Sequence, residues 1–447
     1  MLKMNADKNY YELDKKYVWH PWTSTYQIES NNIIMESGEG CYVTDINGKT
    51  YLDAKSAVLN ASCGYSHPKI INAIHNQLTK LMNFDHAEFS TVPPIFLAEK
   101  LSKLLPAELE RTFFCTSGSE ATETAIKMAR MYFQIEGRKQ KTKIISLDKG
   151  YHGITLGALA ASNVSLAKDE VYSLPTDYEC IPTPVCEKCA SFISHEACKL
   201  PGGKELEDKI LELGAETVAA FIMEPILGLG GIIIPTKEYM QEIRDICFKY
   251  EIKFILDETM TCMGRTGKMF AFEHFGIVPD ILVCGKGISG GYFPISTITT
   301  SQDIYYRFCQ DPFLNGFRHG HTNSGHATAA ATALATINVI EEENLVKNSK
   351  DIGIYLLDKL LNLKKKYDFI YNVRGLGLVM AIDINQKAAN DNLIAKLCME
   401  QGLIIRQMGS TLVLLPPLII KKSESDKIIS ILDQVFHQIS ELGAVTC

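Results

Sequence analysis

The sequence predicts an α/β protein, with a large domain whose mostly parallel sheet is covered by helices and a smaller α+β domain. In the middle of the chain, short apolar runs alternate with amphipathic helical stretches, an order typical of a parallel sheet covered by helices. This alternation ends near residue 330. The chain has 447 residues, of which 46% are hydrophobic and 22% charged, which excludes a mostly disordered protein.

The elements follow from local patterns. Residues 41–53 predict two strands joined by an Asn-Gly turn. Apolar residues at helical spacing predict helices over 68–82 and 93–105. The large domain then continues with predicted strands at 112–117, 143–148, 218–225, 253–258, 281–286 and 295–300, and with helices at 121–137 and 236–251. The segment 176–204, which contains prolines and cysteines, is interpreted as a long loop.

A long helix over 325–345 is expected to lead into the smaller domain. We therefore predict three parts: 1–65 as an N-terminal segment that joins the small domain and lines the active site, 66–330 as the large cofactor-binding domain, and 331–447 as the C-terminal small domain.

Charge and cysteine usage exclude several classes of protein. The net charge is −7 without a basic stripe, so we expect no nucleic-acid partner. No run reaches the about 18 uninterrupted apolar residues of a membrane span, and the polar N-terminus does not resemble a secretory signal. The thirteen cysteines are odd in number and lie mostly in apolar runs, which favours reduced thiols in the cytoplasm.

Polar side chains follow the predicted strands where each strand ends. In an open parallel sheet these ends form one edge, and ligands bind there. The residues at this edge are Ser117, Gly118, Ser119, Tyr151, His152, Glu224, Asp257 and Lys286. Each has an ordinary alternative, since serine caps helices and most lysines are solvated. However, a helix start favours a phosphate, and a lysine that directly follows an apolar strand is expected to be a nucleophilic amine with a lowered pKa.

Together these groups predict a site for pyridoxal 5'-phosphate. Such a site needs a lysine for the Schiff base, a carboxylate that holds the pyridine nitrogen protonated, an aromatic face and a phosphate site. The GRTGK stretch at 264–268 lacks the spacing of a phosphate loop, so an ATPase is not favoured.

With these residues, the chain resembles the class III (ω-amino acid type) aminotransferases of pyridoxal phosphate fold type I. The resemblance extends over nearly the whole chain from residue 19. The matching stretches are SGSEATETAIKMAR, GYHGITLGAL, IMEPILGLGG, the segment 257–296, RHGHTNSGHATAAA and VRGLGLVMAID.

The resemblance implies a role for each matching residue. Lys286 would carry the cofactor and move the proton, and Asp257 would pair with the pyridine nitrogen. Gly118 and Ser119 would hold the phosphate. The remaining cofactor contacts implied are Ser117, His152, Glu224, Met260, Tyr151 stacked on the ring, and Thr259 on its opposite face.

Two implied residues concern the partner subunit and the substrate. Thr322 is similar to the residue that reaches the phosphate of the neighbouring subunit's cofactor, which implies an isologous homodimer. Arg406 resembles the arginine that binds the carboxylate of the amino acceptor, and a guanidinium suits that role because it grips a carboxylate with two hydrogen bonds. Family members use the residue at Glu224 to pair with this arginine.

Some residues depart from the family pattern. Met260 stands where a glutamine usually helps near the phenolic oxygen of the ring, and it cannot donate that hydrogen bond. Val58, Leu59, Ile154 and the run 413–417 differ from the diaminopelargonate (biotin pathway) branch, which therefore ranks below an ω-amino donor. The cysteine-containing insertion is similar to that of taurine– and ω-amine–pyruvate aminotransferases.

The sequence leaves alternatives for the residues of the substrate pocket and for a metal site. Trp22 and Val58 are predicted substrate-binding residues, together with Tyr151 and Arg406. Trp19, Tyr26 and Leu59 are further candidate walls, with plain packing as the alternative for each. Cys186, Cys189, His195 and Cys198 have a spacing that a zinc ion could use, but reduced loop cysteines are favoured.

We therefore expect a ping-pong transfer from an ω-amino acid or primary amine to an α-keto acid, pyruvate or 2-oxoglutarate. The alternatives are the diaminopelargonate-type enzyme and a racemase, epimerase or aminomutase on the same scaffold. A non-catalytic binding protein is disfavoured because Lys286 and Asp257 are both present.

Overall fold

The computed structural model describes residues 9–24, 33–164, 173–183, 202–385, 387–388 and 392–441. The cysteine cluster of the 176–204 insertion and Tyr26 therefore lie outside the described residues. No helix within the described ranges is long and apolar enough to cross a membrane.

A seven-stranded sheet forms the centre of the large domain, in the order β4-β10-β9-β8-β7-β5-β6. Its strands are β4 (Arg111–Cys115), β5 (Lys143–Leu147), β6 (Tyr178–Ile181), β7 (Val218–Met223), β8 (Lys253–Glu258), β9 (Ile281–Cys284) and β10 (Ser296–Thr300). The five strands from β6 to β9 are mutually parallel, and β10 runs antiparallel to both of its neighbours. The predicted α/β fold is thus confirmed.

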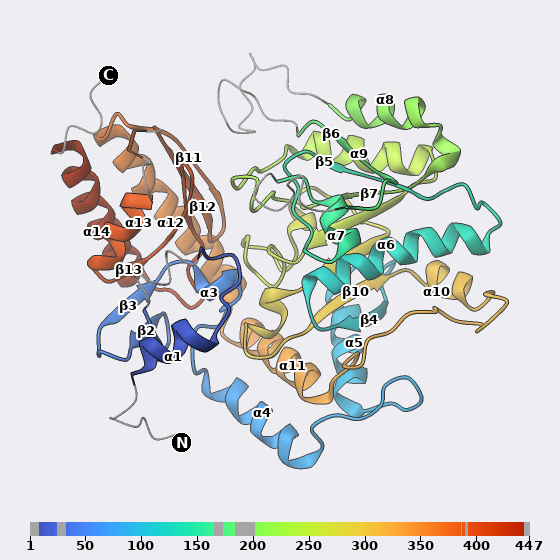
Figure 1. Cartoon of the computed structure of the whole chain (residues 1–447), viewed down its shortest axis with the longest axis horizontal. Helices are drawn as coiled ribbons and strands as arrows, with labels where there is room; N and C mark the ends of the chain where they lie inside the picture. The colour runs from blue at the N-terminus through green and yellow to red at the C-terminus, as the bar shows by residue number, and fades with distance from the viewer. Residues whose placement is uncertain are drawn as a thin grey trace.

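Helices cover this sheet (Figure 1). The helices of this part of the chain are α4 (Pro68–Lys80), α5 (Val92–Leu104), α6 (Gly118–Ile135), α7 (Leu156–Ala161), α8 (Lys204–Leu213), α9 (Lys237–Lys249), α10 (Gln302–Phe308) and α11 (Ala327–Glu342). Short 3-10 turns lie at Ala215–Thr217 (η1), Ala271–His274 (η2) and Lys286–Ser289 (η3). Helix α6 buries apolar residues against β7, β9 and β10, and α11 packs against α4 and α5.

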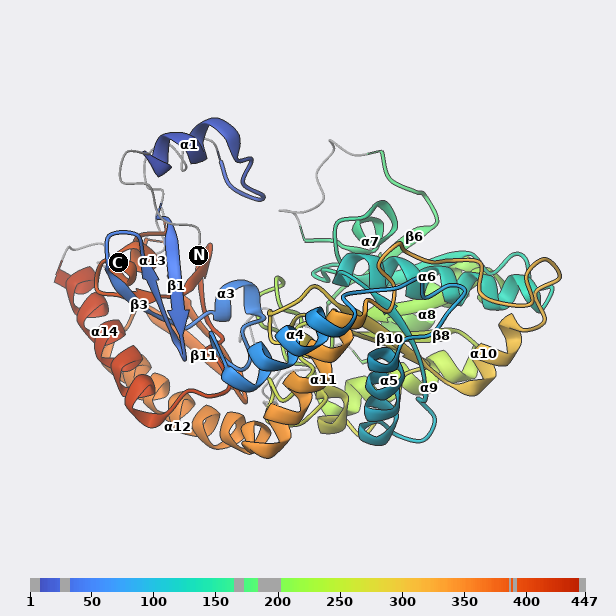
Figure 2. The same cartoon turned by 90° about the horizontal axis from the view of Figure 1, so that it is seen from below.

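The C-terminal part is an antiparallel sheet of order β11-β12-β15-β14 backed by helices. Its elements are α12 (Leu345–Lys366), β11 (Ile370–Leu376), β12 (Val379–Ile384), α13 (Leu393–Glu400), β13 (Leu403–Ile404), β14 (Arg406–Met408), β15 (Thr411–Leu414) and α14 (Lys422–Glu441). Helices α12 and α14 lie side by side on its outer face (Figures 1 and 2).

The N-terminal strands join this C-terminal part. They are β1 (Met35–Glu39), β2 (Tyr42–Asp45) and β3 (Thr50–Asp53), and the sheet is completed by β13, parallel to β3. Helices α1 (Tyr10–Tyr17) and α3 (Ser56–Leu59) flank them. This pairing supports the predicted grouping of residues 1–65 with the small domain, and the three-part division remains our proposal.

The structure differs from the sequence prediction in two places. Residues 176–204 are not entirely loop, because β6 pairs with β5 at the edge of the sheet. Its four residues are bounded by Pro175 and Pro182 and are too few to show a period. The helix expected over 325–345 ends at Glu342, because Asn344 adopts a left-handed φ of +54° and is the N-cap of α12, which begins at Leu345.

Candidate active site

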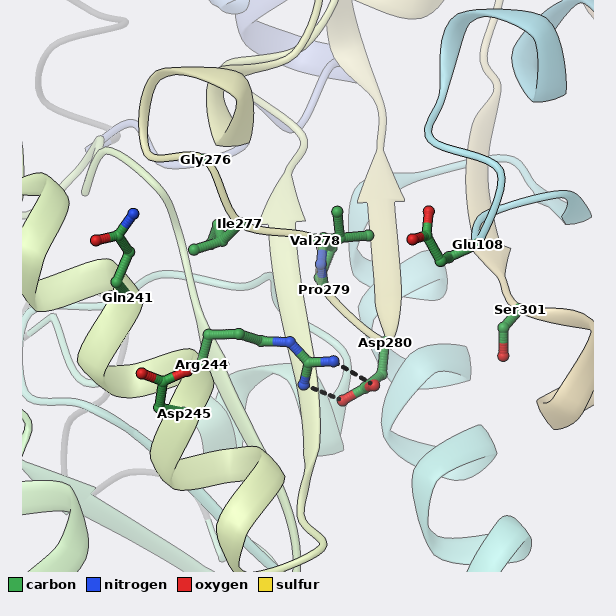
Figure 3. Close-up of a pocket in the computed structure, with 10 residues that line it drawn as sticks. All are labelled: Glu108, Gln241, Arg244, Asp245, Gly276, Ile277, Val278, Pro279, Asp280 and Ser301. Carbon is green, nitrogen blue, oxygen red and sulfur yellow. Dashed lines mark hydrogen bonds and ion pairs between the residues drawn. The ribbon is translucent and has the colours of Figure 1, made fainter.

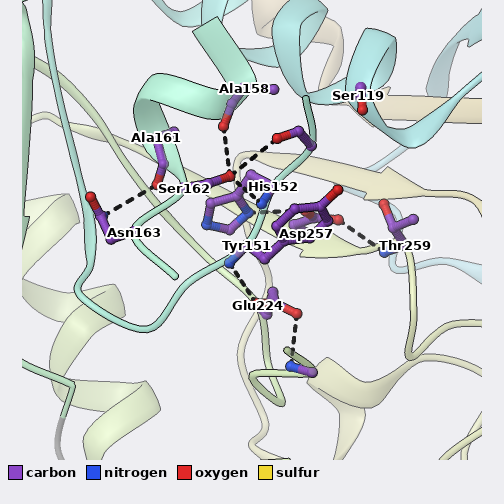
Figure 4. Close-up of polar contacts among 12 residues, drawn as sticks. Ser119, Tyr151, His152, Ala158, Ala161, Ser162, Asn163, Glu224, Asp257 and Thr259 are labelled. Atoms are coloured by element: carbon purple, nitrogen blue, oxygen red, sulfur yellow. Dashed lines mark hydrogen bonds and ion pairs between the residues drawn. The ribbon is translucent and has the colours of Figure 1, made fainter. Parts of the chain in front are cut away.

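Asp257 is a buried carboxylate near the end of β8, with an exposed fraction of 4%. Its Oδ2 lies 3.0 Å from Nδ1 of His152, and its Oδ1 accepts a hydrogen bond from the backbone N–H of Thr259 at 3.0 Å (Figure 4). Burial acts to raise the pKa of Asp257, but these hydrogen bonds outweigh it, so the pKa lies below its ordinary value. The carboxylate therefore stays ionised at neutral pH.

His152 comes from the segment between β5 and α7. Its backbone N–H donates to Oγ of Ser162 at 2.8 Å, and Ser162 in turn donates to the carbonyl of Ala158 at 2.8 Å (Figure 4). The ring is buried, and among the described residues its Nε2 has no hydrogen-bond partner. Within these residues the one polar contact of the ring is with Asp257, and it holds that carboxylate in place.

Glu224 is a second buried carboxylate, directly after β7. Its Oε1 accepts from the backbone N–H of Tyr151 at 3.0 Å, and its Oε2 accepts from that of Gly228 at 2.9 Å (Figure 4). Burial raises the pKa of Glu224 to about 7, and hydrogen bonds from two backbone N–H groups do not reverse that shift. Glu224 thus titrates in the neutral range, in contrast to Asp257.

Lys286 begins η3, two residues after β9 ends. Its φ is +41°, a strained value for a residue with a side chain, and such strain often marks a functional site. Burial lowers the pKa of the Lys286 ammonium below its ordinary value, and the charges of Asp257 and Glu224 only partly oppose this. A lowered pKa makes the neutral, nucleophilic amine more available.

The first turn of α6 lies beside this lysine. The Oγ of Ser117 caps the helix by accepting from the backbone N–H of Glu120 at 3.2 Å. A Cβ added at Gly118 would lie 2.9 Å from Cγ2 of Thr259, and one added at Gly285 would lie 3.0 Å from the same methyl group. Thr259 therefore packs between the start of α6 and the turn that carries Lys286.

Ser119 is held by the segment that carries His152. Its Oγ accepts a hydrogen bond from the backbone N–H of Ile154 at 3.0 Å. Gly153, with a φ of +131°, approaches so closely that an added Cβ would lie 2.5 Å from Oγ of Ser119. The start of α6 and the segment that carries His152 are thus in direct contact.

These residues fit pyridoxal phosphate. Among the residues that the structure describes, the buried Oγ1 of Thr259 has no hydrogen-bond partner, so a bound group could provide one. The N–H groups of the first turn of α6 favour a phosphate. Asp257 would hold the pyridine nitrogen protonated, and Lys286 would bond to the aldehyde. Tyr151 keeps its phenol protonated, since burial raises its pKa.

Arg406 approaches the site from β14. It is partly buried, and burial lowers the pKa of its guanidinium while the nearby Tyr151 raises it. Met260 lies in an apolar cluster with Leu59 and Val413, and a Cβ on Gly228 would lie 2.7 Å from its Sδ. Met260 thus packs against the backbone that holds Glu224.

The residues predicted to line the substrate pocket or to reach the partner subunit are exposed in this single chain. Val58, in the short helix α3, is 69% exposed, and Trp22 is 59% exposed. Thr322 is exposed in the loop before α11. Within the described part of this single chain, no contact joins Trp22 or Thr322 to Lys286. These three assignments remain predictions.

A cavity of about 550 Å³ lies elsewhere, around the paired side chains of Arg244 and Asp280 (Figure 3). Asp280 directly precedes β9, and its Oδ2 accepts from the backbone N–H of Phe254 near the start of β8. This cavity therefore sits at the amino ends of the strands, opposite the edge that carries Asp257 and Lys286.

Sequence reasoning missed several supporting residues. Ser162 and Gly153 fix the His152 segment, and Gly285 allows Thr259 to approach the lysine turn. The two glycines, each next to a predicted site residue, were a signal of close backbone approach. Ser162 carried no such signal.

The fold and the site define a pyridoxal phosphate-dependent enzyme of fold type I. A family model described as "Aminotransferase class-III" matches residues 25–436, and the chain belongs to this family. The expected fold, reaction class and cofactor are thereby confirmed.

The chain is similar to known aminotransferases over nearly the whole length of both proteins. A taurine–pyruvate aminotransferase of Bilophila wadsworthia is 36% identical, over 96% of this chain and 97% of the relative. An adenosylmethionine-8-amino-7-oxononanoate aminotransferase of Methanocaldococcus jannaschii is 35% identical, over 98% and 99%. The crystal structure of an omega transaminase from Pseudomonas jessenii in complex with PMP has a TM-score of 0.91 at 32% identity, over 97% and 99%.

Proposed function

We propose that this enzyme transfers an amino group from an ω-amino acid or primary amine to an α-keto acid, in two alternating half-reactions. The arrangement of Lys286, Asp257, Glu224 and Arg406 around Tyr151 carries this proposal. The cofactor, when bound, supplies an electron sink for the substrate carbon.

The protein residues would divide the work as follows. Lys286, with its lowered pKa, takes a proton from the substrate carbon and returns it on the cofactor side. Asp257, kept ionised by His152, holds the ring nitrogen protonated. Tyr151 would cover one face of the ring and Thr259 the other, and Ser117, Gly118 and Ser119 would hold the phosphate.

Arg406 is proposed to bind the carboxylate of the acceptor, pyruvate or 2-oxoglutarate. Its side chain is partly buried beside Tyr151, and a guanidinium binds a carboxylate with two hydrogen bonds. When the donor lacks an α-carboxylate, Glu224 can neutralise the guanidinium instead.

The donor side is proposed to be apolar. Val58 and Ile154 are exposed aliphatic residues, at 69% and 45%. Ile154 directly follows the Gly153 that packs on Ser119, and its backbone N–H donates to Oγ of Ser119, so Ile154 adjoins the proposed phosphate site. Aliphatic walls suit an amine with an alkyl chain better than a donor with a second cationic group.

We also propose an isologous homodimer with shared active sites. Exposed apolar residues gather on α4, α5 and the segment between them: Ile71, Leu78, Leu81, Met82, Phe84, Phe89, Val92, Ile95 and Phe96. Such a contiguous set marks an interaction surface. The loop with Thr322 adjoins it, since Thr328 N–H and Oγ1 both donate to the carbonyl of Met82.

A reducing compartment, the cytoplasm, is the proposed location. Nine cysteines of the described residues are free thiols, and seven of them are buried. Buried free thiols are typical of proteins in reducing compartments.

The test is a visible absorption spectrum of the holoenzyme while amines are added singly. Taurine, β-alanine, alanine, a diamine and S-adenosylmethionine form the series. One donor should convert the pyridoxal band to the pyridoxamine band, and pyruvate or 2-oxoglutarate should restore it.

A band that never converts, while the stereochemistry of an amino acid scrambles, would instead support a racemase, epimerase or aminomutase. The relatives and the structure described above are all transaminases by name, which does not favour that alternative. Conversion by S-adenosylmethionine alone would move the proposal to the diaminopelargonate-type reaction.

A further inference from the structure

Arg374 is a buried arginine of β11 that joins the C-terminal sheet to the loop after Glu224. Its exposed fraction is 6%. Its Nε donates to the carbonyl of Ile232 at 2.9 Å, and its Nη2 donates to the carbonyl of Gly231. The same guanidinium pairs through both terminal nitrogens with the carboxylate of Asp383 on β12.

The loop end held by Arg374 is conformationally strained. Gly231 has a φ of +109° and Ile232 a φ of +55°, and a β-branched residue rarely adopts the latter. At the other end of this loop, Gly228 N–H donates to Glu224 at 2.9 Å. The backbone N–H of Ile232 also bonds to the carbonyl of Gly228 at 3.2 Å. One short turn therefore connects Arg374 to Glu224.

The other side of the ion pair leads to the strand of Arg406. Oγ1 of Thr411 donates to Oδ1 of Asp383 at 2.8 Å. Thr411 starts β15, which pairs with β14, and Arg406 lies opposite Val413 in that pairing. In Figure 1, β12 lies on the side of the C-terminal part that faces the large domain.

We propose that Arg374 is a positioning residue that sets the distance between Glu224 and Arg406. Its bonds to Gly231 and Ile232 fix the loop that holds the Glu224 carboxylate. Its ion pair with Asp383 fixes the sheet that carries Arg406. This inference rests on the proposed role of Arg406 in binding the acceptor's carboxylate. Arg374 itself touches no substrate.

An arginine is needed because only a guanidinium offers five donors in a rigid fork. Arg374 uses it to bond two carbonyls and a carboxylate at once. A lysine would keep the charge opposite Asp383, but its single nitrogen cannot reproduce this geometry. The loop would still be anchored by the bridge between Leu227 and Ile233 and by the apolar contacts of Ile232, so Arg374→Lys should fold.

The experiment compares R374K holoenzyme with wild type. The KM for pyruvate should rise about tenfold, since small displacements of a positioning group cost one to two orders of magnitude, while kcat/KM for butylamine, which has no carboxylate, changes little. The Kd of propionate, a carboxylate without a carbonyl group, should rise by a similar factor in calorimetry. D383N should reproduce the pattern, and the double variant should add little to either single one.

Arg244→Lys is the matched control. Arg244 forms the same kind of two-point pair, with both terminal nitrogens 3.2 Å from the oxygens of Asp280, at the far end of the sheet (Figure 3). R244K should leave the KM for pyruvate and the Kd of propionate unchanged.

The outcomes separate this inference from the proposed function. Equal losses for pyruvate and butylamine, or an unchanged propionate Kd in R374K, would overturn the positioning role. Propionate binding needs no turnover, so it tests Arg374 even if the wild type transfers no amino group to any keto acid. In that last case the proposed function fails by itself. Should R374K lose its cofactor or its thermal transition, D383N carries the same comparison.

Discussion

Nδ1 of His152 lies 3.0 Å from Oδ2 of Asp257, and both side chains are almost completely buried. In an apolar environment a carboxylate tends to become protonated. The pKa of Asp257 nevertheless lies below its ordinary value, because the hydrogen bonds from His152 and Thr259 stabilise its charge. If Asp257 holds the pyridine nitrogen as proposed, His152 would support the cofactor's electron sink without touching the substrate.

His152→Gln should lower kcat about tenfold, since one pKa unit at Asp257 corresponds to about 1.4 kcal/mol. The pKa of Asp257 is expected to rise, so the loss should be greater at acidic pH and smaller at alkaline pH. The measurement is kcat as a function of pH. H274Q is the control, because His274 is a partly buried histidine that bonds to Thr266 away from the site. A uniform loss at every pH would contradict the assignment.

Because the Glu224 carboxyl group titrates near neutral pH, we expect the KM for the keto acid to depend on pH. Its pKa is raised to about 7, so it is neutral below that pH and ionised above it. Only the ionised form competes with the substrate carboxylate for Arg406. The KM for pyruvate should therefore rise about threefold to tenfold between about pH 6 and about pH 8.

Glu224→Gln removes the titrating group and keeps an amide of similar shape. E224Q should flatten this KM profile. A KM profile that is identical in E224Q and wild type would assign the titration to another group.

The fold and the position of the site could be predicted because they follow from local patterns. Apolar runs such as 218–225 and 253–258 define buried strands, and the strand ends place Glu224, Asp257 and Lys286 at one edge. Strand β6 was not predicted because its four residues are too few to show a measurable period.

Other features depend on contacts between distant segments, which one sequence does not show. Gly153 packs against Ser119, a residue 34 positions earlier in the chain. The apolar surroundings of Met260 come from α3, the loop after β7 and the C-terminal sheet. The pKa of Glu224 likewise reflects burial by several segments. Thr322 remains a prediction because its proposed contact lies in a second chain.

Gly285→Ala should weaken the site by overpacking. The added Cβ would lie 2.8 Å from Oγ of Ser296 and 3.0 Å from Cγ2 of Thr259, and such insertions cost about 1–3 kcal/mol. We expect a lower thermal midpoint and a weaker cofactor affinity, since the shift moves Lys286. The measurements are thermal unfolding and cofactor titration. G316A is the control, because its nearest neighbour would be 3.9 Å away; equal behaviour of both variants would refute the packing argument.

Mixing two inactive or impaired variants tests the shared site. Lys286→Ala should lose the visible band of the bound cofactor and at least about 10²-fold of the activity. Thr322→Ala should weaken cofactor binding about tenfold, through loss of one charge-assisted hydrogen bond. If Thr322 acts on the partner's cofactor, a K286A/T322A heterodimer contains one site with both wild-type groups. Refolding the two together at limiting cofactor should then raise activity above the mean of the separate samples. The mixed sample must be shown to be dimeric by light scattering. If its activity then equals only this mean, Thr322 lies within its own subunit's site or outside the site altogether.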